Sequence, residues 1–160
     1  MHILDDPEMK EIVLNFKNES LELIGELEEI LEDLDEEMKA SELERFGQVI
    51  DRIMGAAKSI GLKDIGTYTE LGKIISYKAS QTDNDQLLNV VLATLFDATD
   101  IIKKMLMNIY SPENESDKVK VEAFTKRLNW LSAKFNDIER CSIAITQPND
   151  ETFKTKKANK

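Results

Sequence analysis

Residues whose types and spacing could carry chemistry are concentrated in the segment 44–62. Glu44 and Gln48 lie four positions apart, which places an acid and an amide on one face of a helix. Asp51 and Gly55 have the same spacing, so a carboxylate would lie one turn from a glycine that leaves the backbone uncovered. This segment therefore holds the candidate functional residues.

Small residues and glycines follow Asp51 in a characteristic order. Residues 51–62 read DRIMGAAKSIGL. The segment resembles the signature of histidine-phosphotransfer (HPt) domains, which in outline is His-x-x-Lys-Gly-(Ser/Ala)-(Ser/Ala)-x-x-(Leu/Ile)-Gly-(Leu/Ala/Phe). The positions that agree with this signature are Gly55, Ala56, Ala57, Ile60, Gly61 and Leu62. Ala56 and Ala57 are expected to let neighbouring helices pack closely, and Gly61 is expected to end the helix.

The expected order of helices agrees with the same family. A long acidic first helix, the signature helix, a short third helix and two longer ones resemble the phosphotransfer domain at the front of chemotaxis histidine kinases. The resemblance covers roughly residues 7–145. It implies a helical bundle whose partners are response-regulator receiver domains and histidine kinases.

The chain departs from the signature at the two positions that carry its chemistry. Asp51 stands where the pattern has its phospho-accepting histidine, and Met54 stands where it has lysine. The single histidine of the chain, His2, precedes the first predicted helix and is expected to lie too far from any packed site to accept phosphate. We therefore expect a non-catalytic, HPt-like module that binds a receiver domain or a histidine kinase without passing phosphate.

Asp51 is not expected to accept phosphate itself. Receiver aspartates are phosphorylated within a cluster of acids that holds Mg²⁺ beside a lysine, and no second carboxylate lies one turn from Asp51. A fixed carboxylate would instead imitate part of the charge of phosphohistidine, and an exposed methionine beside a glycine suits a protein interface. The predicted partner-binding residues are Gln48, Asp51, Arg52, Met54, Gly55, Lys58 and Ser59.

Two other interpretations are open. Glu44 and Gln48 resemble the acid-x-x-x-Gln arrangement of helical phosphatases, in which the amide orients a water against a receiver's aspartyl phosphate. Ser41 and Glu44 also fit a capping box, which would give Glu44 a structural role. Alternatively, the chain is an interaction bundle unrelated to phosphorelays, and Gly55 only allows helices to pack closely.

Apolar residues recur at helical spacing in five segments, whereas no alternating strand pattern occurs. These apolar residues are expected in the core, among them Ile12 in the first segment and Phe96 in the fourth. The sequence therefore predicts an all-α fold: an antiparallel four-helix bundle with a fifth helix packed on it or extending it. The helix starts are expected at Asp6-Pro7, Ser41 and Asp64, after the polar run 80–85, and after the turn 111–116. The expected divisions are an extension at 1–6, the bundle at 7–146 and a disordered tail at 147–160.

Composition limits the function classes. The net charge of −10, from 21 basic and 31 acidic residues, argues against nucleic acid as a ligand. No apolar run reaches the roughly 18 to 20 residues that cross a bilayer, and the acidic N-terminal segment is unlike a signal peptide, so we expect a cytoplasmic protein. With no histidine inside a predicted helix, and with Cys141 expected as a buried apolar residue, we expect no metal, cofactor or enzymatic activity.

Overall fold

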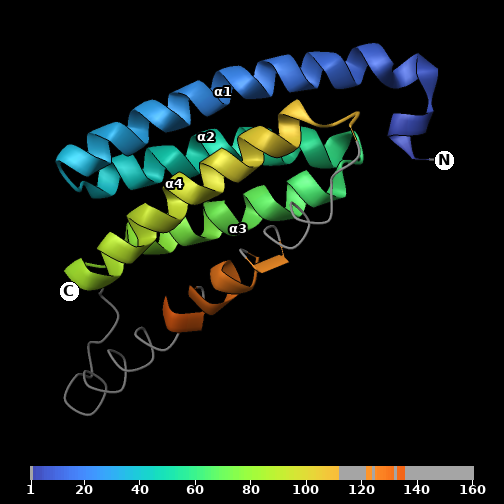
Figure 1. The fold of residues 1–160 in the computed structure, drawn as a ribbon. Coiled ribbons are helices and arrows are strands. Elements are labelled where there is room, and N and C mark those ends of the chain that lie inside the picture. The colour runs from blue at the N-terminus through green and yellow to red at the C-terminus, as the bar shows by residue number, and fades with distance from the viewer. Residues whose placement is uncertain (1, 112–121, 124, 132, 136–160) are drawn as a thin grey trace, which may run out of the picture.

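The computed structural model describes residues 2–111, 122–123, 125–131 and 133–135, and the regular secondary structure in these ranges is entirely helical. The prediction of an all-α chain is therefore confirmed for the described residues. Two short 3-10 turns come first, and four long helices follow (Figure 1). The bounds are η1 Ile3–Asp5, η2 Pro7–Met9, α1 Lys10–Glu36, α2 Ala40–Ser59, α3 Lys63–Ala79 and α4 Asp85–Met107.

The four long helices lie side by side, and successive helices run in opposite directions (Figure 1). Helix α1 packs on α2 and α4, and α3 packs on the same two helices. Their apolar stripes meet in one core, whose largest fully buried side chains include Phe46, Ile24, Leu27, Ile50 and Leu95. None of the helices in the described part of the chain is long and apolar enough to cross a membrane.

Side-chain caps form at the starts of η2 and α4. The Asp6 carboxylate accepts a hydrogen bond from the backbone N–H of Glu8 at 2.9 Å, with Pro7 in the first position of η2. The chain then passes through this 3-10 turn before α1 begins at Lys10. Asn84 Oδ1 accepts from the backbone N–H of Leu87 at 3.0 Å and caps α4.

The predicted caps at Ser41 and Asp64 are wrong. Helix α2 has Lys39 as its N-cap, and α3 has Leu62, with no side-chain cap at either position. Both helices begin directly after short connections, so Ser41 and Asp64 already lie in the first helical turn. An acid in that turn still interacts favourably with the free N–H groups of the helix start.

Gly61 ends α2 as predicted. It has a positive φ of 86°, a conformation that glycine adopts without steric cost. The N–H of Gly61 donates to the carbonyl of Lys58 at 3.2 Å, and the N–H of Leu62 donates to that of Ala57 at 2.9 Å. This is the Schellman arrangement, and it turns the chain so tightly that α2 and α3 form an antiparallel helical hairpin.

The apolar stripes are buried with some exceptions. Ser20 fills the gap in the α1 stripe and is itself only 2% exposed. Ile12 of α1 and Phe96 of α4 were expected in the core, yet they are 45% and 38% exposed. Both lie at the edges of their stripes, where the position of the neighbouring helix, and not the spacing alone, decides burial.

The described residues between 122 and 135 are helical, as predicted for a fifth helix. Leu128 and Leu131 are fully buried, and Phe135 is 2% exposed. Arg127 pairs with Asp97 of α4 at 2.8 Å, which ties this segment to α4. The other apolar residues predicted for this helix, Cys141 among them, and the predicted tail at 147–160 lie outside the described residues.

Candidate functional site

Helix α2 separates into a buried and an exposed face. Leu43, Phe46, Ile50, Ile53 and Ala57 are between 0% and 1% exposed and fill the core. Because residues three and four positions apart share a face, the side of α2 opposite the core consists of other positions. The exposed residues on it are Gln48, Arg52, Gly55 and Ser59.

Three further predicted site residues lie on the edge of α2 that faces α3. Asp51 and Met54 are half-buried, and Lys58 is exposed. Asp51 and Lys58 each contact a side chain of α3, and Met54 occupies the helical position between them. We call the seven residues together the α2 face: Gln48, Asp51, Arg52, Met54, Gly55, Lys58 and Ser59.

Gly55 is open to solvent. A Cβ atom built on Gly55 would meet no other atom within 4 Å. The α2–α3 contact is close at other glycines, because a Cβ on Gly47 would lie 3.0 Å from Ser76 Oγ and one on Gly72 would lie 2.9 Å from Ile50 Cδ1. Helix packing therefore does not require glycine at position 55. Because glycine within a helix costs about 0.5 to 1 kcal/mol relative to alanine, its presence there calls for another explanation.

The two alanines of the signature segment differ from one another. Ala57 is fully buried, which agrees with a role in close helix packing. Ala56 is exposed and extends the open surface around Gly55. Ser59 is also exposed, and its hydroxyl donates to the carbonyl of Ala56 at 2.9 Å. The expectation that both alanines serve packing is therefore wrong for Ala56.

The carboxylate of Asp51 is paired with a lysine of α3. Lys73 Nζ lies 2.8 Å from Asp51 Oδ1, and the two side chains are 42% and 46% exposed. Asp51 is thus accessible, but its negative charge is compensated by its neighbour. Lys73 was not among the predicted site residues, because nothing within α2 indicates it.

The hairpin explains how this residue could have been found. An antiparallel hairpin closed at Gly61 brings residues before the turn close to residues after it, and long side chains bridge differences of a helical turn or more in their distance from the turn. Asp51 lies ten positions before Gly61, and Lys73 lies twelve positions after it. Lys58 and Glu70 form a second ion pair across the same two helices at 3.1 Å.

Arg52 differs from the other charged residues of the α2 face. It is exposed, and within residues 2–111 no carboxylate forms an ion pair with it. Arg45, on the same helix, pairs with Glu42 at 3.4 Å. The guanidinium of Arg52, three positions before Gly55, is therefore available to another molecule.

Glu44 and Gln48 are both exposed on α2, four positions apart. The predicted capping box does not form, since α2 has no side-chain cap. In the described structure, Glu44 also takes part in no ion pair. The structural role expected for Glu44 is thus absent, and both side chains are accessible.

His2 lies closer to packed structure than expected. It lines a surface hollow together with Ile60, Gly61 and Lys63 of the α2–α3 turn. Its Nδ1 atom accepts a hydrogen bond from the backbone N–H of Leu4 at 3.2 Å. Ile60 is nine positions from Asp51, about 13 Å along a helix, so His2 does not replace the missing histidine of the α2 face.

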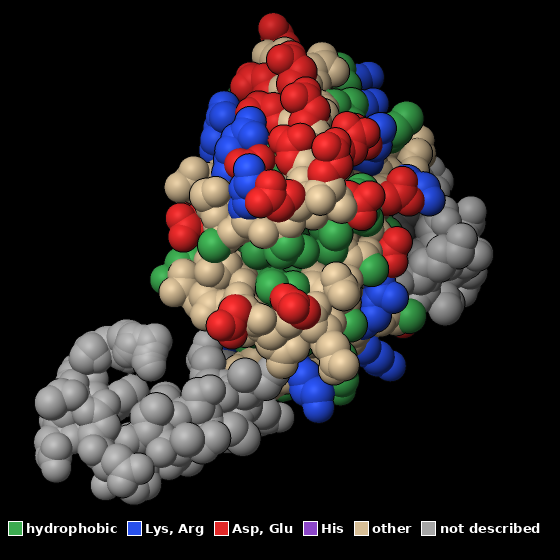
Figure 2. All heavy atoms as spheres, turned by 90° about the vertical axis from the view of Figure 1, so that its left-hand side faces the viewer, with side chains coloured by type: hydrophobic (Ala, Val, Ile, Leu, Met, Phe, Trp, Pro, Cys, Tyr) green, Lys and Arg blue, Asp and Glu red, His purple; other side chains and the backbone are tan. Residues whose placement is uncertain are grey.

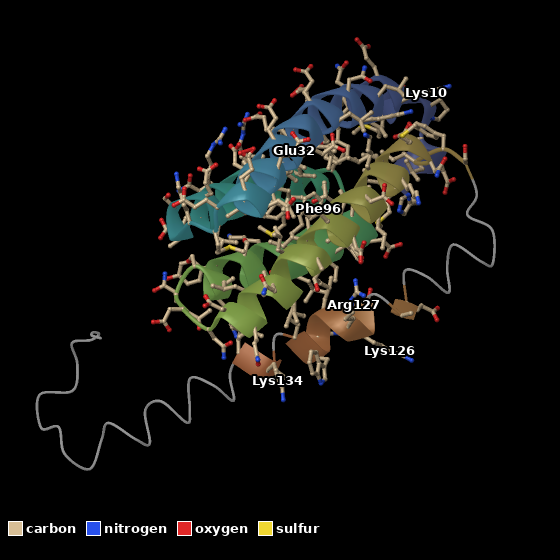
Figure 3. All side chains as sticks on the ribbon, turned by 60° about the vertical axis from the view of Figure 1, so that its left-hand side comes forward. Lys10, Glu32, Phe96, Lys126, Arg127 and Lys134 are labelled. Atoms are coloured by element: carbon tan, nitrogen blue, oxygen red, sulfur yellow. The ribbon has the colours of Figure 1, made fainter. Side chains whose placement is uncertain are left out.

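Many of the chain's acidic residues lie on another element. They line the outer side of α1, where Figure 2 shows a ridge of acidic side chains. Figure 3 shows Glu32 on this ridge, whereas Lys126, Arg127 and Lys134 lie at the opposite side of the molecule, on the helical segment near 125–135. No group of three or more potential metal ligands occurs among the described residues. Comparison with protein-family models, curated proteins and solved structures finds no match to this chain.

Proposed function

We propose that this chain is a non-catalytic, HPt-like signalling module of the cytoplasm. Its four long helices would form an antiparallel four-helix bundle of the HPt type, with the segment around 125–135 as part of a fifth helix. Its α2 face would bind a response-regulator receiver domain or a histidine kinase, and so modulate a two-component pathway without passing phosphate.

One observation carries this proposal: Gly55 opens into empty space on an exposed helix face, one turn from Asp51. A partner's backbone can approach a helix most closely where no side chain projects from it. Asp51 stands where the HPt signature has its histidine, so docking would occur without an imidazole to carry phosphate. Close packing of α2 against α3 requires a glycine at Gly47 and Gly72 but not at Gly55.

The test uses the full chain and the purified receiver domains and kinase fragments of its host. Gly55→Arg should abolish binding, because an arginine side chain would occupy the space into which the partner packs. Gly25→Arg is the matched control, since a Cβ on Gly25 of α1 also meets nothing within 4 Å. Circular dichroism and thermal unfolding should be nearly the same for both variants and the parent chain.

Two results would contradict the proposal. Binding that survives both Gly55→Arg and Asp51→Arg would place the partner elsewhere, for example on α4 and the fifth helix, as in an interaction bundle unrelated to phosphorelays. Loss of binding together with loss of helicity in Gly55→Arg would make Gly55 a folding residue.

A second function is favoured by Glu44 and Gln48. Both are exposed on one side of α2, and Glu44 is free of the capping role that would have occupied it. In this alternative, the Gln48 amide would orient a water against the aspartyl phosphate of a receiver, and Glu44 would contact the receiver's lysine. The chain should then shorten the half-life of a phosphorylated receiver, and Gln48→Ala should abolish the effect. Binding with an unchanged half-life would exclude this activity.

A further inference from the structure

We infer that the α2 face recognises the acidic pocket of a receiver domain in its Mg²⁺-free, unphosphorylated state, and that Arg52 is the residue that contacts this pocket. This inference rests on the proposed function and adds to it the chemical state of the partner. It follows from the distribution of charge on α2 and α3.

The charges around Gly55 cancel except for that of Arg52. Asp51 is paired with Lys73 at 2.8 Å, and Lys58 is paired with Glu70 at 3.1 Å. Each pair has a net charge of zero, whereas Arg52 is exposed and has no ion-pair partner within residues 2–111. The charges of the α2 face and of its ion-pair partners on α3 therefore sum to +1, in a chain whose net charge is −10. Glu44, the nearest unpaired acid on α2, lies eight positions before Arg52, about 12 Å along the helix.

The pairing with Lys73 changes what Asp51 presents to a partner. A carboxylate can imitate phosphohistidine only if its negative charge is felt by the partner, and an ammonium group at 2.8 Å compensates that charge. Both side chains remain more than two-fifths exposed, so the pair is partly solvated and can rearrange when a partner docks. Lys73 is therefore a positioning residue that keeps Asp51 from repelling an acidic surface.

An acidic pocket is the chemistry that fits such a surface. The carboxylates with which a receiver holds Mg²⁺ lose most of their counter-charge when the metal is absent, because only the neighbouring lysine then remains. A guanidinium offers a planar fork of N–H donors that matches carboxylate oxygens, and Arg52 lies three positions from the open backbone at Gly55. The acidic ridge on α1 would repel the same partner, so the overall field favours an approach from the α2 face.

The experiment measures the dissociation constant of the full chain for purified receiver domains of its host, by isothermal titration calorimetry. One titration is made in EDTA and one in Mg²⁺, at matched ionic strength. Mg²⁺ should weaken binding by roughly tenfold, because it neutralises the pocket that Arg52 contacts. Arg52→Glu should weaken the metal-free complex by at least about tenfold and remove the effect of Mg²⁺.

Two further variants separate Arg52 from general electrostatics. Arg45→Glu makes the same charge change on the same helix, but at a residue already paired with Glu42, and should have a much smaller effect. Asp51→Asn leaves Lys73 unpaired and adds a positive charge to the surface. It should therefore tighten the metal-free complex by a few-fold.

The outcomes are distinguishable. Binding that Mg²⁺ strengthens, or that Asp51→Asn weakens while Arg52→Glu leaves it unchanged, would mean that the Asp51 carboxylate itself contacts the partner. That result overturns this inference but leaves the proposed function intact, provided that Gly55→Arg still abolishes binding. If no receiver domain binds in either buffer, both this inference and the receiver part of the proposed function fail. Binding to a kinase fragment alone would then leave the histidine kinase as the partner.

Discussion

The open position at Gly55 predicts that Gly55→Ala stabilises the protein. The new methyl group would meet no atom within 4 Å, so it introduces no steric cost. Position 55 lies within α2, where alanine is favoured over glycine by about 0.5 to 1 kcal/mol. For a domain of this size, we expect the melting temperature to rise by about 1 to 4 °C.

The same substitution at packed glycines should have the opposite sign. A Cβ on Gly72 would lie 2.9 Å from Ile50 Cδ1, and Ile50 is fully buried, so its side chain has little room to move. The resulting strain is expected to cost about 1 to 3 kcal/mol, more than the gain in helix propensity. Gly47→Ala, with Ser76 Oγ at 3.0 Å, should lie between the two.

Urea denaturation followed by circular dichroism at 222 nm measures these changes. The free energy of unfolding should increase in the order Gly72→Ala, Gly47→Ala, parent chain and Gly55→Ala. A decrease for Gly55→Ala, with an unchanged denaturant dependence, would refute the reasoning, because it would mean that another part of the chain covers Gly55. Such a result would also remove the main support for the α2 face.

Three other changes test the structure more widely. Burial raises the pKa of the Tyr68 hydroxyl, so the unfolded state loses this proton at a lower pH than the folded state. The free energy of unfolding should therefore fall as the pH rises above about 10, by at most about 1.4 kcal/mol per pH unit. Tyr68→Phe should flatten that decline in urea titrations. A double-mutant cycle on Asp51 and Lys73 should give a coupling of about 0.2 to 1 kcal/mol, because the pair is partly exposed. Leu27→Ala in the core should cost about 2 to 5 kcal/mol in the same denaturation assay, whereas Ile12→Ala at an exposed position should cost much less.

Each of these expectations has a contrary result. An alkaline decline as steep in Tyr68→Phe as in the parent chain would assign it to other groups. A coupling of zero between Asp51 and Lys73 would mean that the ion pair is not populated in solution. Similar losses for Leu27→Ala and Ile12→Ala would contradict the assignment of α1's buried side.

Local features of the fold could be predicted where one segment contains the whole cause. Asp6 caps the first turn and Gly61 ends α2, because each depends on the backbone within a few residues. The predicted caps at Ser41 and Asp64 failed where the connection to the preceding helix decided where the next helix began. The predicted burial of Ile12 and Phe96 was wrong for a related reason, because helical spacing does not show how wide a surface the neighbouring helix covers.

The candidate site was predictable only in part. Gln48, Arg52, Gly55 and Ser59 share an exposed side of α2, which follows from the helical period once the core-facing residues are known. The contact of Asp51 with Lys73 required the register between α2 and α3. The short turn at Gly61 sets that register, but the distance between the two side chains is known only once the two helices are packed.

The amino-acid sequence by itself determined that this chain is helical and which sides of its helices avoid water, because periodicity and glycine conformation act over one or two turns. Tertiary structure decided the charge of the α2 face. Asp51 pairs with a lysine 22 positions away, and among the charged residues of the α2 face only Arg52 has no ion-pair partner in the described part of the chain. Charges interact through space, so the packing of α3 against α2 sets what a partner would meet there.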